Sequence, residues 1–337
     1  MPDPNGEKNR KVCVHFETVP CDFCGCSDSD LVFEAKDTNY FYEGVFRLVR
    51  CRSCQLVYLN PRPAPESVSY FYPDGDYTCF RRAAGDNIRL GRNHPVMRIG
   101  ANNRKPPGSL LDIGCGNGDF LVAARNAGWT VAGIEPNAYA RGIARRRVGD
   151  EAVASSLVEG NHPSGRFQMV TMWHVLEHLH SPSRALHEVS RILEPGGVLG
   201  IAVPNFDSFE RRTWGRDWIA VMPPTHLYHF TRRSLCRYLV SAGFQTTDLI
   251  YQPGSISLAA NILRTARRLL IDSGNPVPKR GREPSTSVAS LGTAQVAYEA
   301  RKESVRNVLT KLVYPLSWCI AKARLGPELM VFARRVR

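Results

Sequence analysis

Short apolar runs alternate with stretches of helical spacing through the middle of the chain. The apolar runs lie at residues 110–113, 131–135, 152–154, 167–173, 198–203 and 246–251. The stretches between them that repeat apolar positions every three or four residues lie at 119–127, 138–147 and 183–193. The runs predict strands and the stretches predict helices. Since strands separated by helices pair in parallel through right-handed crossovers, this order predicts an α/β fold.

The alternation stops after about residue 254. At residues 255–271 the apolar positions fall on one helical face, with Arg264 and Arg268 opposite. A second helical region at 301–324 is expected to be interrupted at Pro315, because proline lacks the N–H group that a helix interior uses. The apolar run at 328–333 predicts a final strand, so a helical insert precedes the last strand.

The front of the chain carries two matched cysteine pairs. Four of the ten cysteines stand as Cys21-x2-Cys24 and Cys51-x2-Cys54. Residues rich in β-formers lie between the pairs and predict short antiparallel strands. Two thiolates spaced in this way can face one metal ion, and two such pairs complete a tetrahedral Zn²⁺ site. The pattern therefore predicts a zinc ribbon at residues 19–60, with a structural metal.

A glycine-rich turn joins the first central strand to the first helix. It reads Gly114-Cys115-Gly116-Asn117-Gly118, and Asp119 stands where the dinucleotide fingerprint has its third glycine. A negative charge there opposes a pyrophosphate, which favours the positive end of a helix. The turn therefore suits a nucleoside ligand without phosphates. Glu135, at the end of the second strand, is placed to accept hydrogen bonds from ribose hydroxyls.

These motifs resemble those of the class I S-adenosylmethionine-dependent methyltransferases. Residues 110–118 (LLDIGCGNG) are similar to motif I, 133–136 (GIEP) to the ribose-binding strand end, 173–179 (WHVLEHL) to the end of strand four, and 193–199 (LEPGGVL) to the turn into strand five. The resemblance implies a Rossmann-like sheet of seven strands, the last antiparallel, and S-adenosyl-L-methionine as the cofactor. By resemblance, the cofactor-binding residues are Asp112, Gly114, Cys115, Gly116, Gly118, Glu135 and Trp173.

Four histidines, His174, His178, His226 and His229, are candidates for the catalytic base that methylation of an oxygen acceptor needs. His174 and His178 follow the fourth strand, at the edge of a parallel sheet where ligands bind. His226 lies in the segment 223–230 (PPTHLYHF), which resembles a methyltransferase group that carries a zinc ribbon. His226 is the first choice for contact with the acceptor. An equally good interpretation is that His226 fixes a substrate lid and that His178 orients the loop after its strand.

The net charge of the chain is +13, and it is unevenly distributed. Fifteen basic and five acidic residues from 255 to 337 give that region a net +10. Basic amphipathic helices can lie on an anionic membrane, or they can cover a sheet edge and present their charges to water. No apolar stretch is long enough to span a bilayer, and the first twenty residues contain no apolar run. We therefore expect a cytoplasmic protein that could contact the inner membrane face peripherally.

The combined interpretation is a methyltransferase that acts on a small-molecule, sugar-linked or lipid-linked acceptor, on oxygen. Its core resembles ubiquinone-pathway O-methyltransferases. An RNA-modifying enzyme is disfavoured because no Asn-Pro-Pro-Tyr type motif follows the fourth strand. A sugar C-methyltransferase and a non-catalytic cofactor-binding scaffold stay open. The expected segments are a flexible leader (1–18), the zinc ribbon (19–60), a connecting segment (61–104), the S-adenosylmethionine-binding core (105–254), a basic helical insert (255–325) and the last core strand (326–337).

Overall fold

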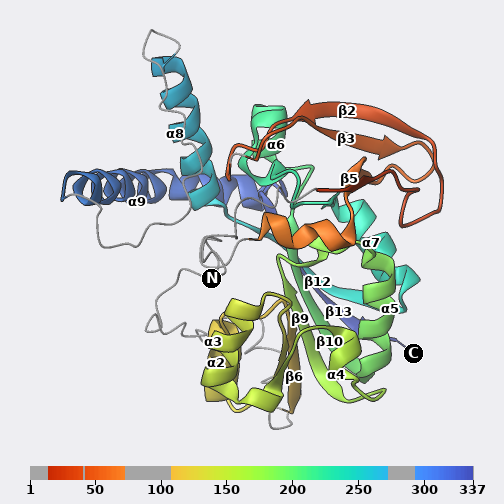
Figure 1. Cartoon of the computed structure of the whole chain (residues 1–337). Coiled ribbons are helices and arrows are strands. Elements are labelled where there is room, and N and C mark those ends of the chain that lie inside the picture. Colours follow the sequence, from red (N-terminus) through yellow and green to blue (C-terminus); the bar gives the residue numbers. More distant parts are fainter. Residues whose placement is uncertain (1–13, 41, 73–107, 272–292, 337) are drawn as a thin grey trace, which may run out of the picture. The chain divides into compact units, whose positions relative to one another are not determined.

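The computed structural model describes residues 14–40, 42–72, 108–271 and 293–336, with side chains outside 267–271 and 293–303 (Figure 1). Within this part of the chain the residues form two compact units. The first contains Met1–Pro204, Met222–Ile250 and Met330–Arg337. The second contains Asn205–Val221 and Tyr251–Leu329. Sequence patterns placed residues 205–221 in the central core, whereas the structure groups them with the helical insert.

A mixed sheet of seven strands forms the centre of the first unit, counted over the described residues. The strands are β6 (Ser109–Ile113), β7 (Thr130–Ile134), β8 (Val153–Ala154), β9 (Phe167–Trp173), β10 (Leu193–Pro204), β12 (Phe244–Gln252) and β13 (Glu328–Arg335). Their order across the sheet is β12-β13-β10-β9-β6-β7-β8. The pairs from β10 to β8 are parallel, and the sheet ends in antiparallel pairing. The predicted α/β class and the predicted final strand are confirmed.

Helices cover this sheet and complete its core. They are α2 (Asp119–Asn126), α3 (Ala138–Val148), α4 (Leu157–Gly160), α5 (Pro182–Ile192) and α7 (Arg232–Ser241), with short 3-10 turns η1 (Pro65–Phe71), η3 (Asp150–Ala152) and η4 (Leu176–His178). Leu110, Leu121 and Met169 are fully buried in one core cluster. Burial on both faces explains why the parallel strands are almost continuously apolar. Sequence patterns predicted a helix up to residue 193 and a strand from residue 198. In the structure β10 already begins at Leu193 and continues through a register shift to Val198.

The cysteine module forms a second, antiparallel sheet in the same unit. Its strands are β2 (Ser29–Ala35), β3 (Phe46–Cys51), β4 (Val57–Leu59) and β11 (Tyr228–His229), in the order β11-β4-β3-β2. Strand β11 comes from the histidine-containing segment 223–230, far along the chain from the other three strands. A separate pair joins β1 (Phe16–Glu17) to β5 (Arg62–Pro63). The expectation of a flexible leader to residue 18 is therefore wrong for residues 16–17, because they pair with the strand at 62–63. Residues 1–13 of the expected leader lie outside the described part of the chain.

The second unit is helical. It contains α6 (Phe209–Trp214), the 3-10 turns η5 (Gly215–Asp217) and η6 (Ile219–Val221), α8 (Ser255–Ile271) and α9 (Thr293–Lys322). The expected break at Pro315 is wrong, since α9 continues through it. Proline costs a helix one N–H donor and a clash with the preceding turn, and the buried side chains of Ser317 and Ala321 pack on one side of the helix beyond it. Among the described residues, no helix has the length and apolar character needed to cross a membrane.

Candidate active site

The glycine turn and the acid of the second strand meet at the carboxyl edge of the sheet. Glu135 follows β7 directly and is buried. One carboxylate oxygen accepts a hydrogen bond from the backbone N–H of Gly116 at 2.9 Å, and the other accepts one from Asn137 at 2.8 Å. Burial raises the pKa of Glu135, while these two backbone donors and the charge of Arg141 lower it. Each oxygen keeps acceptor capacity for a ribose hydroxyl.

The three glycines of the turn have different reasons to be glycine. All three have positive φ angles, of +72° at Gly114, +56° at Gly116 and +82° at Gly118. A Cβ on Gly114 would clash with Cγ2 of Val175, and one on Gly118 would lie 3.2 Å from the Cα of Ala144. A Cβ on Gly116 would meet no atom within 4 Å. Packing therefore requires Gly114 and Gly118, and the open side of the turn is at Gly116.

Two aspartates flank this turn in different environments. Asp112 is buried on β6 and accepts a 2.6 Å hydrogen bond from the hydroxyl of Thr171. Burial raises its pKa to about 7, and the hydrogen bond from Thr171 opposes the shift. Asp119, at the start of α2, forms an ion pair with Arg147. The charge that disfavours a pyrophosphate at the helix N-terminus is thus held in place by α3.

Two of the proposed cofactor residues turn their side chains into the core. The Cys115 thiol is buried against β7, where a Cβ on Gly133 would lie 2.8 Å from its sulfur. The Trp173 indole packs edge-on against Phe120, with ring centroids 5.7 Å apart, and against Phe332 at 6.2 Å. Cofactor contact at Cys115 and Trp173 therefore stays a prediction that involves their backbones rather than these side chains.

The histidines of η4 and of the segment at 223–230 come together after the fourth strand. The rings of His178 and His226 lie edge to face with centroids 4.7 Å apart, and His229 lies 6.5 Å from His226. The backbone N–H of Leu227 donates to the carbonyl of Glu177 at 2.8 Å, which joins the two segments. His226 and His229 are buried. The structure thus brings the sequence-predicted His178 and His226 into one cluster.

A buried carboxylate completes the cluster. Glu177 is fully buried, and one of its oxygens lies 3.4 Å from Nδ1 of His174. Burial acts to raise the pKa of Glu177, but the side chain of His174 and the charges of the neighbouring imidazoles lower it to about 2. His174 is half-exposed and has a φ of +55°, a conformation that costs a non-glycine residue energy and is found mainly at functional sites.

The ring of His178 is fixed through one nitrogen. Its Nδ1 lies 2.8 Å from the carbonyl oxygen of Thr225 and 2.7 Å from the hydroxyl of Tyr72. Burial lowers the pKa of His178, while the charge of Glu177 and the Thr225 carbonyl oppose this shift. With the Nδ1 hydrogen donated to Thr225, Nε2 carries the lone pair. The geometry therefore gives a neutral imidazole that can accept a proton.

Tyr72 is a site residue that the sequence analysis missed. It ends η1 and places its ring edge-on to His178, with centroids 5.9 Å apart. It also packs beside Ala140 at the start of α3. Tyr72 thus connects the start of α3 to the histidine cluster. An aromatic residue after the proline-rich exit was the only local signal, and nothing in the sequence indicated its partner.

The same cluster has the donor set for a cation. One ligand atom each from Glu177, His178 and His226 lies within 4.8 Å of the others. A carboxylate and two imidazoles suit zinc or another transition metal. The cluster can therefore act either as a base assembly or as a metal site, and the two are chemically distinguishable.

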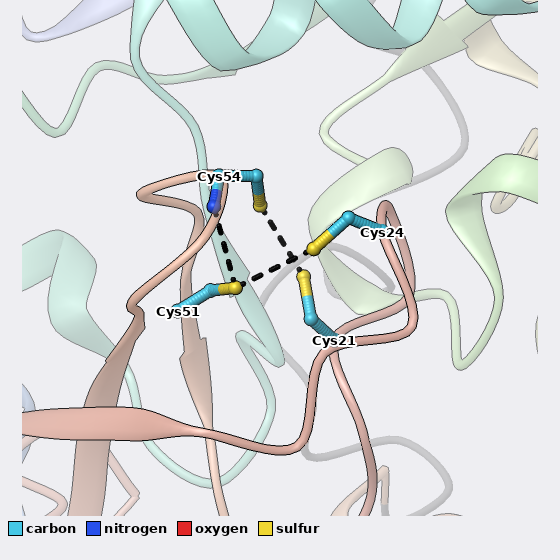
Figure 2. A group of neighbouring side chains, drawn as sticks. All are labelled: Cys21, Cys24, Cys51 and Cys54. Atoms are coloured by element: carbon cyan, nitrogen blue, oxygen red, sulfur yellow. Dashed lines mark hydrogen bonds between the residues drawn. The ribbon is translucent and has the colours of Figure 1, made fainter.

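The four cysteines converge at the ends of two loops (Figure 2). The Sγ atoms of Cys21 and Cys54 lie 3.4 Å apart, and those of Cys24 and Cys51 lie 3.5 Å apart. A tetrahedral zinc with bonds near 2.3 Å places its sulfurs about 3.8 Å apart, so this arrangement fits Zn²⁺ with small adjustments. Gly25 and Gln55 occupy equivalent left-handed positions after the two pairs, with φ of +72° and +67°.

The cysteine loops are fastened to the central fold. Asp22 accepts hydrogen bonds from the N–H and the hydroxyl of Ser183 at the start of α5, and from the hydroxyl of Tyr238 on α7, each at 3.0 Å. Arg237 donates to the carbonyl of Cys54 at 3.0 Å and lies over the ring of Phe23. Because β11 also pairs with β4, the strand carrying His229 belongs to the sheet of the cysteine module.

Comparison with known proteins gives the family. A methyltransferase domain model matches residues 86–249. The ubiquinone biosynthesis O-methyltransferase of Burkholderia pseudomallei is 30% identical over 164 residues, which cover 45% of this chain and 70% of that protein. The chain belongs to the class I S-adenosylmethionine-dependent methyltransferases. The ubiquinone biosynthesis O-methyltransferase of Aromatoleum aromaticum is 31% identical over 156 residues. These residues cover 42% of this chain and 65% of that protein, which is slightly less than two thirds of its length.

The methyltransferase match includes the glycine turn, Glu135 and the histidine cluster. A solved S-adenosylmethionine-dependent methyltransferase from Archaeoglobus fulgidus aligns with a TM-score of 0.43 at 17% identity, over 71% of this chain and 91% of that one. That alignment adds nothing to the assignment. The predicted family, enzyme class and methyl-donor cofactor are confirmed, while the roles of individual residues in this methyltransferase stay predictions.

Proposed function

We propose that this methyltransferase transfers a methyl group to an oxygen atom of a small acceptor, with His178 as the base. The observation that carries the proposal is the assembly of the half-buried His178 with the buried Glu177 and His226, at the sheet edge that also holds Glu135. Relatives named for ubiquinone biosynthesis O-methylation support oxygen as the acceptor atom. A sugar-linked or lipid-linked acceptor is the finer form of the proposal.

The cofactor is proposed to lie across the carboxyl ends of β6 and β7. When bound, S-adenosyl-L-methionine supplies an electrophilic methyl group. Glu135 would accept hydrogen bonds from the ribose, and the open side of the turn at Gly116 would admit the ligand. Asp112 lies beside them, and its raised pKa reflects a buried position that a cationic group would make favourable for the carboxylate. The acceptor oxygen must then be aligned with the methyl group and shielded from water.

The histidine cluster is proposed to remove the acceptor's proton. Nε2 of His178 accepts it, and the Thr225 carbonyl holds the ring in one orientation through Nδ1. The Glu177 carboxylate stabilises the imidazolium that forms. His226 packs against His178 and would contact the acceptor, and His174 lies beside Glu177 on the solvent side. The Zn²⁺ proposed for the four cysteines is structural, because all four positions are occupied by protein ligands.

The first experiment is calorimetric titration with S-adenosylhomocysteine of the wild type, Glu135→Ala and, as a matched control, Glu151→Ala. Glu151 is an exposed acid on η3. Two hydrogen bonds to a charged group are worth about 3 kcal/mol or more, so Glu135→Ala should weaken binding at least about 100-fold. The control should bind like the wild type. Absence of binding by folded, zinc-loaded wild type would refute the cofactor site.

The second experiment follows transfer of labelled methyl groups to a panel of phenolic, sugar and lipid hydroxyl acceptors. His178→Ala should lose at least about 100-fold in turnover while it still binds S-adenosylhomocysteine. If the cluster instead holds a catalytic cation, a chelator treatment that leaves one zinc per chain on the four cysteines should abolish turnover, and Zn²⁺ or another transition metal should restore it. Binding without turnover on any acceptor would indicate a cofactor-binding scaffold. Either result would contradict the proposed role of His178.

A further inference from the structure

Helix α9 carries an apolar stripe on its surface. Val305, Val308, Leu312 and Leu316 are exposed by 51%, 56%, 71% and 54%. At 3.6 residues per turn, their spacing of three, four and four residues places all four within an arc of about 80°. The buried residues Ser317 and Ala321 fall on the opposite side of the helix. The exposed stripe is therefore a continuous face and not a scatter of single side chains.

Positive charges border this stripe on one side. On the helical projection, Lys311 and Lys322 lie beside the edge of the stripe that Val308 forms, within about 60° of it. The Lys322 ammonium group lies over the ring of Trp318, 5.1 Å from its centroid, and that indole is half-exposed. Residues 304–327 contain no aspartate or glutamate. An apolar face bordered by cations and by an interfacial aromatic residue is the arrangement of a helix that lies in a membrane surface.

We propose that α9 docks on an anionic lipid bilayer, with the apolar stripe in the headgroup region and the flanking cations on lipid phosphates. A second copy of the chain fits this face less well. Two-fold pairing of the stripes would bring the cation borders of both helices together with no acidic side chain between them. Lipid phosphates supply the missing negative charge. The proposal goes beyond methyl transfer and does not depend on the identity of the acceptor.

The test is flotation of the full-length protein with vesicles of phosphatidylcholine alone or of phosphatidylcholine mixed equally with phosphatidylglycerol. The wild type should float with the anionic vesicles only, and less at high salt. Each cation near an anionic surface strengthens binding about fivefold, so Lys311→Gln with Lys322→Gln should weaken it about 25-fold. The control Arg232→Gln with Arg233→Gln removes two exposed cations from α7 and should leave binding unchanged.

The apolar stripe is tested by Leu312→Glu, which should weaken vesicle binding about 30-fold or more. Val240→Glu is the matched control, because Val240 is 68% exposed on α7, away from the stripe. Both variants should retain the wild-type affinity for S-adenosylhomocysteine, which separates this result from failure of the proposed enzyme. Equal binding to both vesicle types, or to neither, would overturn the proposal. So would a wild-type dimer in sedimentation that Leu312→Glu converts to monomers.

Discussion

Replacing Asp22 by alanine should weaken the attachment of the cysteine module to the methyltransferase core. Asp22 lies inside the first cysteine loop, yet its three hydrogen-bond donors belong to α5 and α7. Ser181, the residue before α5, provides no side-chain cap to that helix. The carboxylate of Asp22 therefore serves as the missing N-terminal cap of α5, supplied by a segment far away in the sequence.

The size of the effect follows from the two partners. Loss of a helix N-terminal cap costs about 1 kcal/mol. The Tyr238 hydroxyl belongs to a side chain that is 1% exposed, and leaving a buried donor without its acceptor costs about 1–3 kcal/mol. The Asp22→Ala variant should therefore lose about 2–4 kcal/mol of unfolding free energy. Asp30→Ala is the control, because it removes an exposed ion pair with Arg52 and should be indistinguishable from wild type.

The assay is urea unfolding of zinc-loaded protein, followed by tryptophan fluorescence. Zinc content must be measured in the same samples, since Asp22 lies between two proposed zinc ligands. A loss below about 1 kcal/mol with zinc retained would refute the reasoning. In that case the contacts of Asp22 would not hold the ribbon against α5.

Four further predictions concern pH, zinc and the glycine turn. Burial raises the pKa of Glu210 to about 7, so the folded protein holds this proton more tightly than the unfolded chain. The unfolding free energy should therefore fall by up to about 3 kcal/mol as pH rises from 4.5 to 7. Thermal unfolding at pH 5 and pH 8 should show a smaller decline for Glu210→Gln. Cys51→Ser should release zinc, and β11 then loses its partner sheet. Turnover should fall about 10-fold or more while binding of S-adenosylhomocysteine persists. Equal loss of turnover and binding would argue against a coupling between the cysteine module and the histidine cluster. If His178 is the base, kcat/KM should decline on the acid side with a midpoint below pH 6.5, and His178→Asn should remove that limb. Gly114→Ala should destabilise the fold through its clash with Val175 and its positive φ. Gly116→Ala meets no clash but is strained at its φ of +56°, so it should cost less stability and should also weaken cofactor binding, as thermal unfolding and calorimetry would distinguish.

Local patterns predicted the elements of the sheet because strand and helix periods are properties of a few neighbouring residues. The predicted span 167–173 coincides with β9, and 255–271 coincides with α8. The expected break at Pro315 was wrong, because α9 continues through the proline, with the side chain of Ser317 packed two residues beyond it. Local sequence contains the proline but not the packing that compensates for it.

The sequence by itself determined the glycine turn, the strand-end acid and the cysteine pairs, since each requires particular residue types at fixed short spacing. Only the tertiary structure decided that His226 meets His178, that Tyr72 reaches the same ring and that β11 joins the ribbon sheet. These contacts join segments separated by tens to more than a hundred residues. Their geometry depends on how the whole sheet positions its loops, and no local pattern of residues records that positioning.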